Sequence, residues 1–108
     1  MAQFLAAVSN EGAIGDDQVL NPNTVTEMLS AQVPSVSDSQ YVFWYQTTTA
    51  GRSVIGHNGG DIGVATEMVY SPETGLGVIL LMNVDWGNTV SNAAAEIQDH
   101  LFDHAEGL

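Results

Sequence analysis

The run from Leu76 to Met82, Leu-Gly-Val-Ile-Leu-Leu-Met, constrains the fold of this chain more than any other segment. Its pattern is that of a strand, yet neither of its two alternating faces carries a polar side chain. A strand that is apolar on both faces is normally covered on both sides. We therefore expect the run to lie in a layered structure, with a covering element on each face.

A turn links this run to a second strand-like segment, Val64–Tyr70, that precedes it. Within the turn, Pro72 pre-sets its own φ angle, and Gly75 can adopt the positive φ that closes the turn. The two runs are therefore predicted to form a β-hairpin from Val64 to Asn83.

Helical patterns lie on both sides of the strand-rich part of the chain. Residues Gln3–Asn10 resemble the end of a helix, and Gly12 and Gly15 mark a loop after it. Asn21-Pro22 is a typical helix start, with an N-cap and a proline in the first turn. The stripe that identifies this second helix consists of Val25, Met28 and Leu29. Its end is marked by Pro34, after which a linker is expected.

Two further strands and one long helix complete the prediction. Tyr41–Gln46 is aromatic and β-branched, and Arg52–His57 follows it after a loop at Thr47–Gly51. The final helix is expected over Thr89–His104, with an apolar face formed by Val90, Ala94, Ile97 and Leu101. The fold class is therefore α+β: an antiparallel sheet of three or four strands, two helices before it and a long helix packed on it. Residues 1–108 form one partial domain.

The charge balance limits the possible partners. Acidic residues number 13, Arg52 is the only basic residue, and the formal net charge is −12. Binding to nucleic acid or to an anionic membrane needs Lys and Arg, so neither partner is expected. No run approaches the roughly 20 apolar residues of a membrane span. The absence of cysteine excludes disulfides and thiolate metal sites.

Gly56-His57-Asn58-Gly59-Gly60 is expected where the strand from Arg52 ends. Paired glycines let a backbone approach a ligand closely, and a histidine at a strand end can donate or accept a hydrogen bond there. A tight turn with an incidental histidine would show the same residues, and spacing alone favours that interpretation.

Two other constellations involve histidines. Ser53 lies four residues before His57 and Asp61 four after it, but the sequence around Ser53 lacks the Gly-x-Ser-x-Gly elbow, so we expect no catalytic triad. His100 and His104 share a face of the last helix and could ligate a metal. They lack the glutamate of a zincin helix, and a histidine also suits a helix C-terminus, so no metal or cofactor is expected.

The order and spacing of these segments resemble the C-terminal part of the serine β-lactamase and penicillin-binding-protein superfamily. The closest branch is the class C β-lactamase-like one, with its esterases and D-aminopeptidases. That branch carries Gly-His-x-Gly-Gly and then Asp-Pro-x-Thr-Gly-x-Gly-Val-Val-Val-Leu-x-Asn, which Gly56–Gly60 and Ser71–Asn83 follow. Met1–Leu5 and Leu20–Leu29 resemble helical segments of the family, so the likeness covers nearly the whole chain.

The resemblance implies a substrate-binding role for one segment. His57-Asn58-Gly59 would be the family's third motif, with His57 binding or polarising the substrate and Gly59, Gly60 and Asp61 lining the cleft. The nucleophile motif Ser-x-x-Lys cannot occur in a chain without lysine, and the second motif, Tyr-x-Asn, is also missing. The expectation is a C-terminal fragment of a hydrolase of β-lactams, esters or peptides that is inactive alone. A small acyl substrate is expected only for the full-length parent, whose relatives are often periplasmic or secreted.

The same resemblance predicts a partner. In the family the last strand pairs with N-terminal strands, so here the edge of Leu76–Met82 would be open and apolar. Because a soluble chain rarely tolerates such an edge, we expect it to pair with a second copy in a homodimer. Two alternatives stay open: a stand-alone acidic binding module that reuses the hydrolase sheet, and an acidic mimic of nucleic acid, which the scattered acids disfavour.

Overall fold

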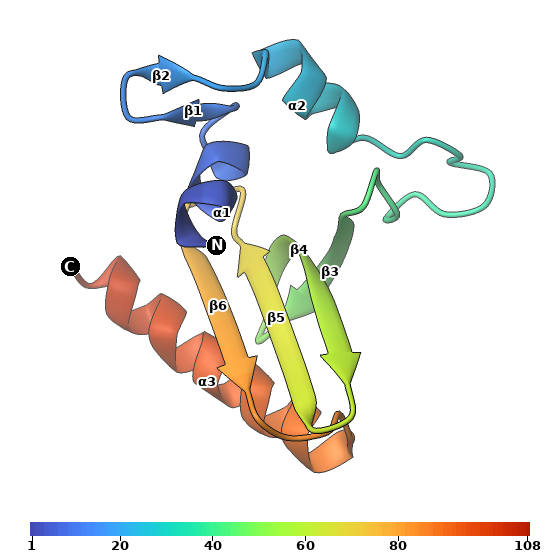
Figure 1. The fold of residues 1–108 in the computed structure, drawn as a ribbon, viewed down its shortest axis with the longest axis vertical. Helices are drawn as coiled ribbons and strands as arrows, with labels where there is room; N and C mark the ends of the chain where they lie inside the picture. The colour runs from blue at the N-terminus through green and yellow to red at the C-terminus, as the bar shows by residue number, and fades with distance from the viewer.

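A four-stranded antiparallel sheet with helices on both faces forms the centre of the molecule (Figure 1). The computed structural model describes all 108 residues. Its strands lie in chain order, β3-β4-β5-β6, and a two-stranded ribbon, β1-β2, lies apart from them. This confirms the predicted α+β class. The elements are α1 (Ala2–Ser9), β1 (Ala13–Ile14), β2 (Asp17–Gln18), α2 (Pro22–Met28), β3 (Tyr45–Thr49), β4 (Arg52–Asp61), β5 (Val64–Tyr70), β6 (Gly77–Met82) and α3 (Asn88–Glu106).

Local signals were reliable where a turn or a cap determines the geometry. The Asn21 side chain accepts a hydrogen bond from the backbone N–H of Asn23, as expected for the N-cap of α2. The hairpin β5–β6 is present, and Gly75 has a φ of 73° in its turn. Both features were predicted from single residues because they depend on backbone conformations that few residue types favour.

The strand predicted at Tyr41–Gln46 is wrong over Tyr41–Trp44, since β3 begins only at Tyr45. The chain turns back before it: the N–H of Tyr41 donates to the carbonyl of Trp44 at 2.8 Å, and Phe43 has a φ of 63°. This turn directs Trp44 into the core, where it is 3% exposed and its ring meets Tyr70 edge-on at 6.5 Å. Burial of the indole therefore overrides the β-propensity of the aromatic run. β3 instead continues to Thr49, where a loop was expected.

The sheet carries a hydrophobic core on each face. The residues on the side of α1 and α2 are Leu5, Val8, Val25, Trp44, Ile55 and Tyr70. Those on the side of α3 are Val54, Val69, Val78, Leu80, Ala94 and Phe102. Coverage of both faces was predicted from the last apolar strand, and it is confirmed for most of β6. The prediction of coverage is wrong at Leu81, whose side chain is 65% exposed.

Helix α3 presents a different face to the sheet from the one predicted. Its buried residues are Ala94, Gln98 and Phe102, while Ile97 and Leu101 are 46% and 40% exposed. Arg52 at the start of β4 explains the rotation, because its guanidinium lies 5.5 Å from the Phe102 ring centre. The same group contacts three acids on one flank of α3: Asp99 at 2.6 Å, Asp103 at 2.5 Å and Glu106 at 3.2 Å. The opposite flank, Ile97 and Leu101, is thereby turned away from the sheet.

Candidate functional site

The segment Gly56–Gly60 was predicted to lie at the end of a strand. In the structure it lies inside β4, which continues to Asp61. It pairs with β5 from Ile55 opposite Tyr70 to Asp61 opposite Val64. The glycines fit this position because the neighbouring strand is close: a Cβ atom on Gly56 would lie 2.3 Å from the Met68 carbonyl oxygen. The glycines therefore permit close strand pairing rather than a turn.

The other edge of this segment is open. Strand β3 pairs only with residues Arg52 to Gly56 of β4, so His57–Asp61 have a strand neighbour on the β5 side alone. Unpaired backbone N–H and C=O groups on a strand edge can bind an extended chain by β-strand addition. The candidate residues thus lie on a stretch of backbone that can accept a ligand.

The imidazole of His57 is exposed at the start of this open edge. Its Nδ1 lies 2.5 Å from the carbonyl oxygen of Asn58. A carbonyl oxygen can only accept, so Nδ1 is the donor in this contact, and Nε2 makes no hydrogen bond within the chain. The ring of Tyr45 lies at a centroid distance of 5.9 Å. This leaves one defined nitrogen of His57 available for a ligand.

An apolar pocket adjoins the histidine. It has a volume of about 310 Å³ and is lined by Phe4, Phe43, Trp44, His57 and Met68. The rings of Phe4 and Trp44 stack at a centroid distance of 5.9 Å, and the Phe43 side chain is 81% exposed beside them. An apolar pocket next to an open strand edge suits a ligand with an extended backbone and an apolar side group.

The side chains of the five predicted site residues do not all lie on one face of the sheet. Side chains alternate along a strand, so His57, Gly59 and Asp61 lie on the α1 face and Asn58 and Gly60 on the α3 face. The carboxylate of Asp61 caps the following turn by accepting from the N–H of Ile62 at 2.7 Å. The structure thus places His57 and the backbone of this strand, but not all five side chains, at the candidate site.

Trp86 supports this strand and was not predicted to do so. Its indole Nε1 donates to the carbonyl oxygen of Gly59 at 2.8 Å. Its ring lies so close to Gly60 that a Cβ atom there would be 2.7 Å from the indole Cδ1. The contact joins segments 27 residues apart in sequence, and no local pattern indicates it.

No catalytic triad forms from Ser53, His57 and Asp61. All three lie on one face of the extended strand β4, where residues four apart are separated by about 13 Å. The hydroxyl of Ser53 accepts a hydrogen bond from the side-chain amide of Gln46 at 2.7 Å instead. Among the 108 residues, no group of three or more His, Cys, Asp or Glu side chains is arranged to hold a metal ion.

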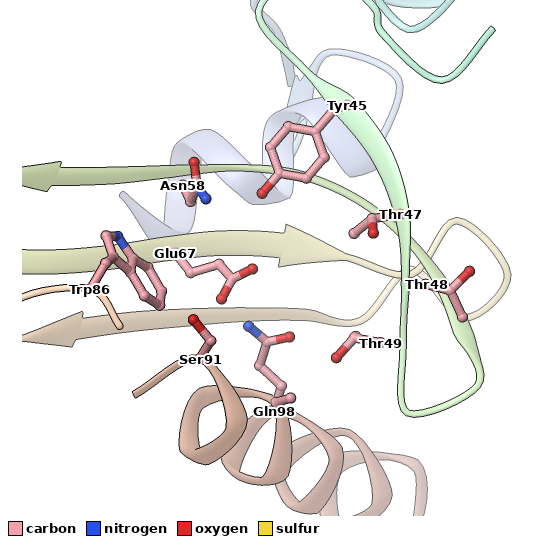
Figure 2. Close-up of a pocket in the computed structure, with 10 residues that line it drawn as sticks. Tyr45, Thr47, Thr48, Thr49, Asn58, Glu67, Trp86, Ser91 and Gln98 are labelled. Atoms are coloured by element: carbon pink, nitrogen blue, oxygen red, sulfur yellow. The ribbon is translucent and has the colours of Figure 1, made fainter. Parts of the chain in front are cut away.

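A second, polar cavity lies on the other face of the sheet, between β3, β4 and α3 (Figure 2). Its volume is about 420 Å³. Burial raises the pKa of Glu67, which lines it, although hydrogen bonding to Gln98 acts in the opposite direction. Burial and the negative charge of Glu67 raise the pKa of Tyr45. Residues of β3, β4, β5, α3 and the loop before α3 meet here, far apart in sequence, so no sequence motif indicated the cavity.

Comparison with family models, with curated proteins and with solved structures finds no match to this chain. None of its helices combines the length and the apolar composition that a membrane crossing requires. Any function proposed for the chain therefore rests on its residues and on the geometry of the two sites.

Proposed function

We propose that this chain is the C-terminal part of a β-lactamase-like serine hydrolase domain, inactive by itself, whose parent acts on β-lactams, esters or peptides. The carrying observation is the position of His57 on an unpaired strand edge beside an apolar pocket. This arrangement supports the substrate-binding role that the resemblance implies for His57–Asp61.

Each part of the site has a role in this proposal. Along the open edge the backbone groups of Asn58 and Gly60 point away from β5, and they pair with the extended part of an acyl substrate. Nε2 of His57 accepts a hydrogen bond from the substrate, and the pocket of Phe43, Trp44 and Met68 receives an apolar group. The nucleophile and its base come from the rest of the parent, because this chain contains no lysine.

The far edge of the sheet gives separate support. Strand β6 has a neighbour only on the β5 side. Beside its free edge, Leu81 and the α3 flank residues Ile97 and Leu101 expose apolar surface. Such an edge is the place where a sheet is extended by a further strand with apolar side chains. A larger parent domain would cover this surface.

The DNA immediately 5′ of this coding region tests the proposal first, since it should encode Ser-x-x-Lys in the same frame. We expect the joined polypeptide to hydrolyse nitrocefin or p-nitrophenyl esters, and this chain alone to give no turnover. In the joined enzyme, His57→Ala should lower kcat/KM at least tenfold, about 1.4 kcal/mol in transition-state binding. Ser53→Ala, on the same strand but paired with Gln46, should leave kcat/KM within about twofold.

Three results would contradict the proposal. Turnover by the chain alone would show that it carries its own nucleophile. An upstream frame without Ser-x-x-Lys would favour a stand-alone binding module. Equal effects of the His57 and Ser53 substitutions would remove His57 from the substrate site.

We further propose that the separate chain forms a homodimer through β6. The N–H of Ser71 donates to the carbonyl of Leu76 at 2.9 Å, which sets the hydrogen-bonding alternation along the hairpin. By that alternation the backbone groups of Gly77, Ile79 and Leu81 point away from β5, toward the free edge. A second β6 strand would pair with them around a two-fold axis.

Leu81→Lys is expected to weaken this dimer at least tenfold, about 1.4 kcal/mol. The substitution places a charge on the edge that would be paired and desolvated in the dimer, while Leu81 makes little contact within the monomer. Sedimentation across a concentration series measures the dissociation constant. Val36→Lys, at a loop residue that is 83% exposed, is the control with the same change of charge. A wild-type chain that stays monomeric at high micromolar concentration would refute self-association.

A further inference from the structure

The polar cavity contains a carboxylate that has no cationic partner. Glu67 lies in the middle of β5, on the face that packs toward α3, between Ala65 and Val69, which are both 0% exposed. All three ion pairs between side chains of the protein belong to Arg52, at the far end of β4. A half-buried carboxylate among core residues is unfavourable unless a positive charge or strong donors meet it. Gln98 supplies hydrogen bonding to it but no charge.

The walls of the cavity suit a positively charged ligand. Figure 2 shows the Glu67 carboxylate facing the same space as the side chains of Tyr45, Trp86 and Gln98. The faces of tyrosine and tryptophan rings attract ammonium groups. Side-chain oxygens of further residues on this face can accept hydrogen bonds from such a group, namely Thr47, Thr49, Asn58 and Ser91. Glu67 and Tyr45 are the only titratable groups that line the cavity.

The negative charge of the whole molecule also favours a cationic ligand. A net charge of −12 raises the local concentration of cations and repels anions. A neutral polyol could form hydrogen bonds in the cavity, but it would leave Glu67 without a counter-charge. A volume of about 420 Å³ lies within the range of small-molecule sites.

We propose that this cavity binds a small primary alkylammonium ion, with Glu67 as its counter-ion and the Tyr45 and Trp86 rings against its alkyl chain. The site lies on the opposite face of the sheet from His57. Tyr45 and Asn58 adjoin both sites, but Glu67 belongs to this cavity alone, so a test at Glu67 separates this proposal from the hydrolase proposal.

Protonation of Glu67 links binding to pH. Its folded-state pKa is raised above the ordinary value of 4.5, so the charged form destabilises the fold above that pKa. The stabilising effect of the protonated form is present at low pH and is lost as pH rises through the folded pKa. An ammonium ion binds only the charged form, so its affinity should fall as pH drops through the pKa of Glu67, and its binding should lower that pKa.

Calorimetric titration with propylammonium at pH 7 tests the proposal, with propionate and 1-propanol as probes of similar size. We expect saturable binding of propylammonium alone, weakened at least tenfold by Glu67→Gln. Glu27→Gln removes the same charge from an exposed position on helix α2 and should leave affinity unchanged. Glu67→Gln should also raise stability at pH 7, since it removes a half-buried charge, which shows that the variant folds.

Three results would contradict the proposal, each for a different reason. If propylammonium shows no saturable binding to the unmodified chain, the site does not exist. If Glu67→Gln and Glu27→Gln weaken binding equally, the attraction is due to net charge rather than to the cavity. If 1-propanol binds as well as propylammonium, the cavity recognises the alkyl group and not the ammonium ion.

Discussion

Phe102→Ala should lower the free energy of unfolding by about 3–5 kcal/mol, a large part of the stability of a domain this size. Phe102 is 0% exposed and belongs to the core between α3 and the sheet, where it packs with Val54, Val69 and Leu80. Its ring also lies beneath the guanidinium of Arg52, at 5.5 Å. Truncation leaves a cavity there and removes the surface that positions Arg52 against the acids of α3.

Equilibrium denaturation in urea measures this effect, and the chain provides a control of the same chemical type. Phe43→Ala removes an identical side chain that is 81% exposed, so it should change stability by less than about 1 kcal/mol. The measurements should be made at one protein concentration, because a dimer makes apparent stability depend on concentration. Comparable losses in both variants would show that α3 does not pack on the sheet as described.

Gly56→Ala should cost about 3 kcal/mol, which is unusual for the addition of one methyl group. A Cβ atom at this position would lie 2.3 Å from the Met68 carbonyl oxygen and 2.6 Å from the Val69 Cγ1. The first contact is with backbone, so β4 and β5 must separate to relieve it. Because His57 follows directly, the same shift moves the open edge of the candidate site.

Gly87→Ala is the matched control for this substitution. Gly87 has an extended φ of −176°, and apart from its chain neighbours no atom lies within 4 Å of the position that a Cβ atom would take. Alanine there should therefore change stability by less than about 1 kcal/mol. Thermal unfolding of both variants, with the amide NMR signals of His57–Asp61 as a local readout, separates strand displacement from a general loss of stability. A Gly56→Ala protein as stable as the Gly87→Ala protein would contradict the β4–β5 register.

The candidate site could be predicted in part. The glycine-rich segment around His57 was identified from the sequence, but it was placed at a strand end because paired glycines are typical of turns. In the structure these glycines accommodate the neighbours of β4: Met68 and Val69 at Gly56, and Trp86 at Gly60. The cavity at Glu67 was missed altogether, since a single glutamate in a strand carries no pattern that distinguishes it from a solvent-exposed residue.

The sequence by itself determined the features that depend on neighbouring residues: the cap of α2 at Asn21, the turn at Gly75, the antiparallel hairpin and the α+β class. Tertiary structure alone decided how distant segments meet. Arg52 rotates α3 by binding its acidic flank, and the core draws Trp44 inward at the expense of a strand. The physical reason is that periodicity encodes which residues share a face, whereas the choice of the buried face depends on charges and volumes contributed by residues far away in the chain.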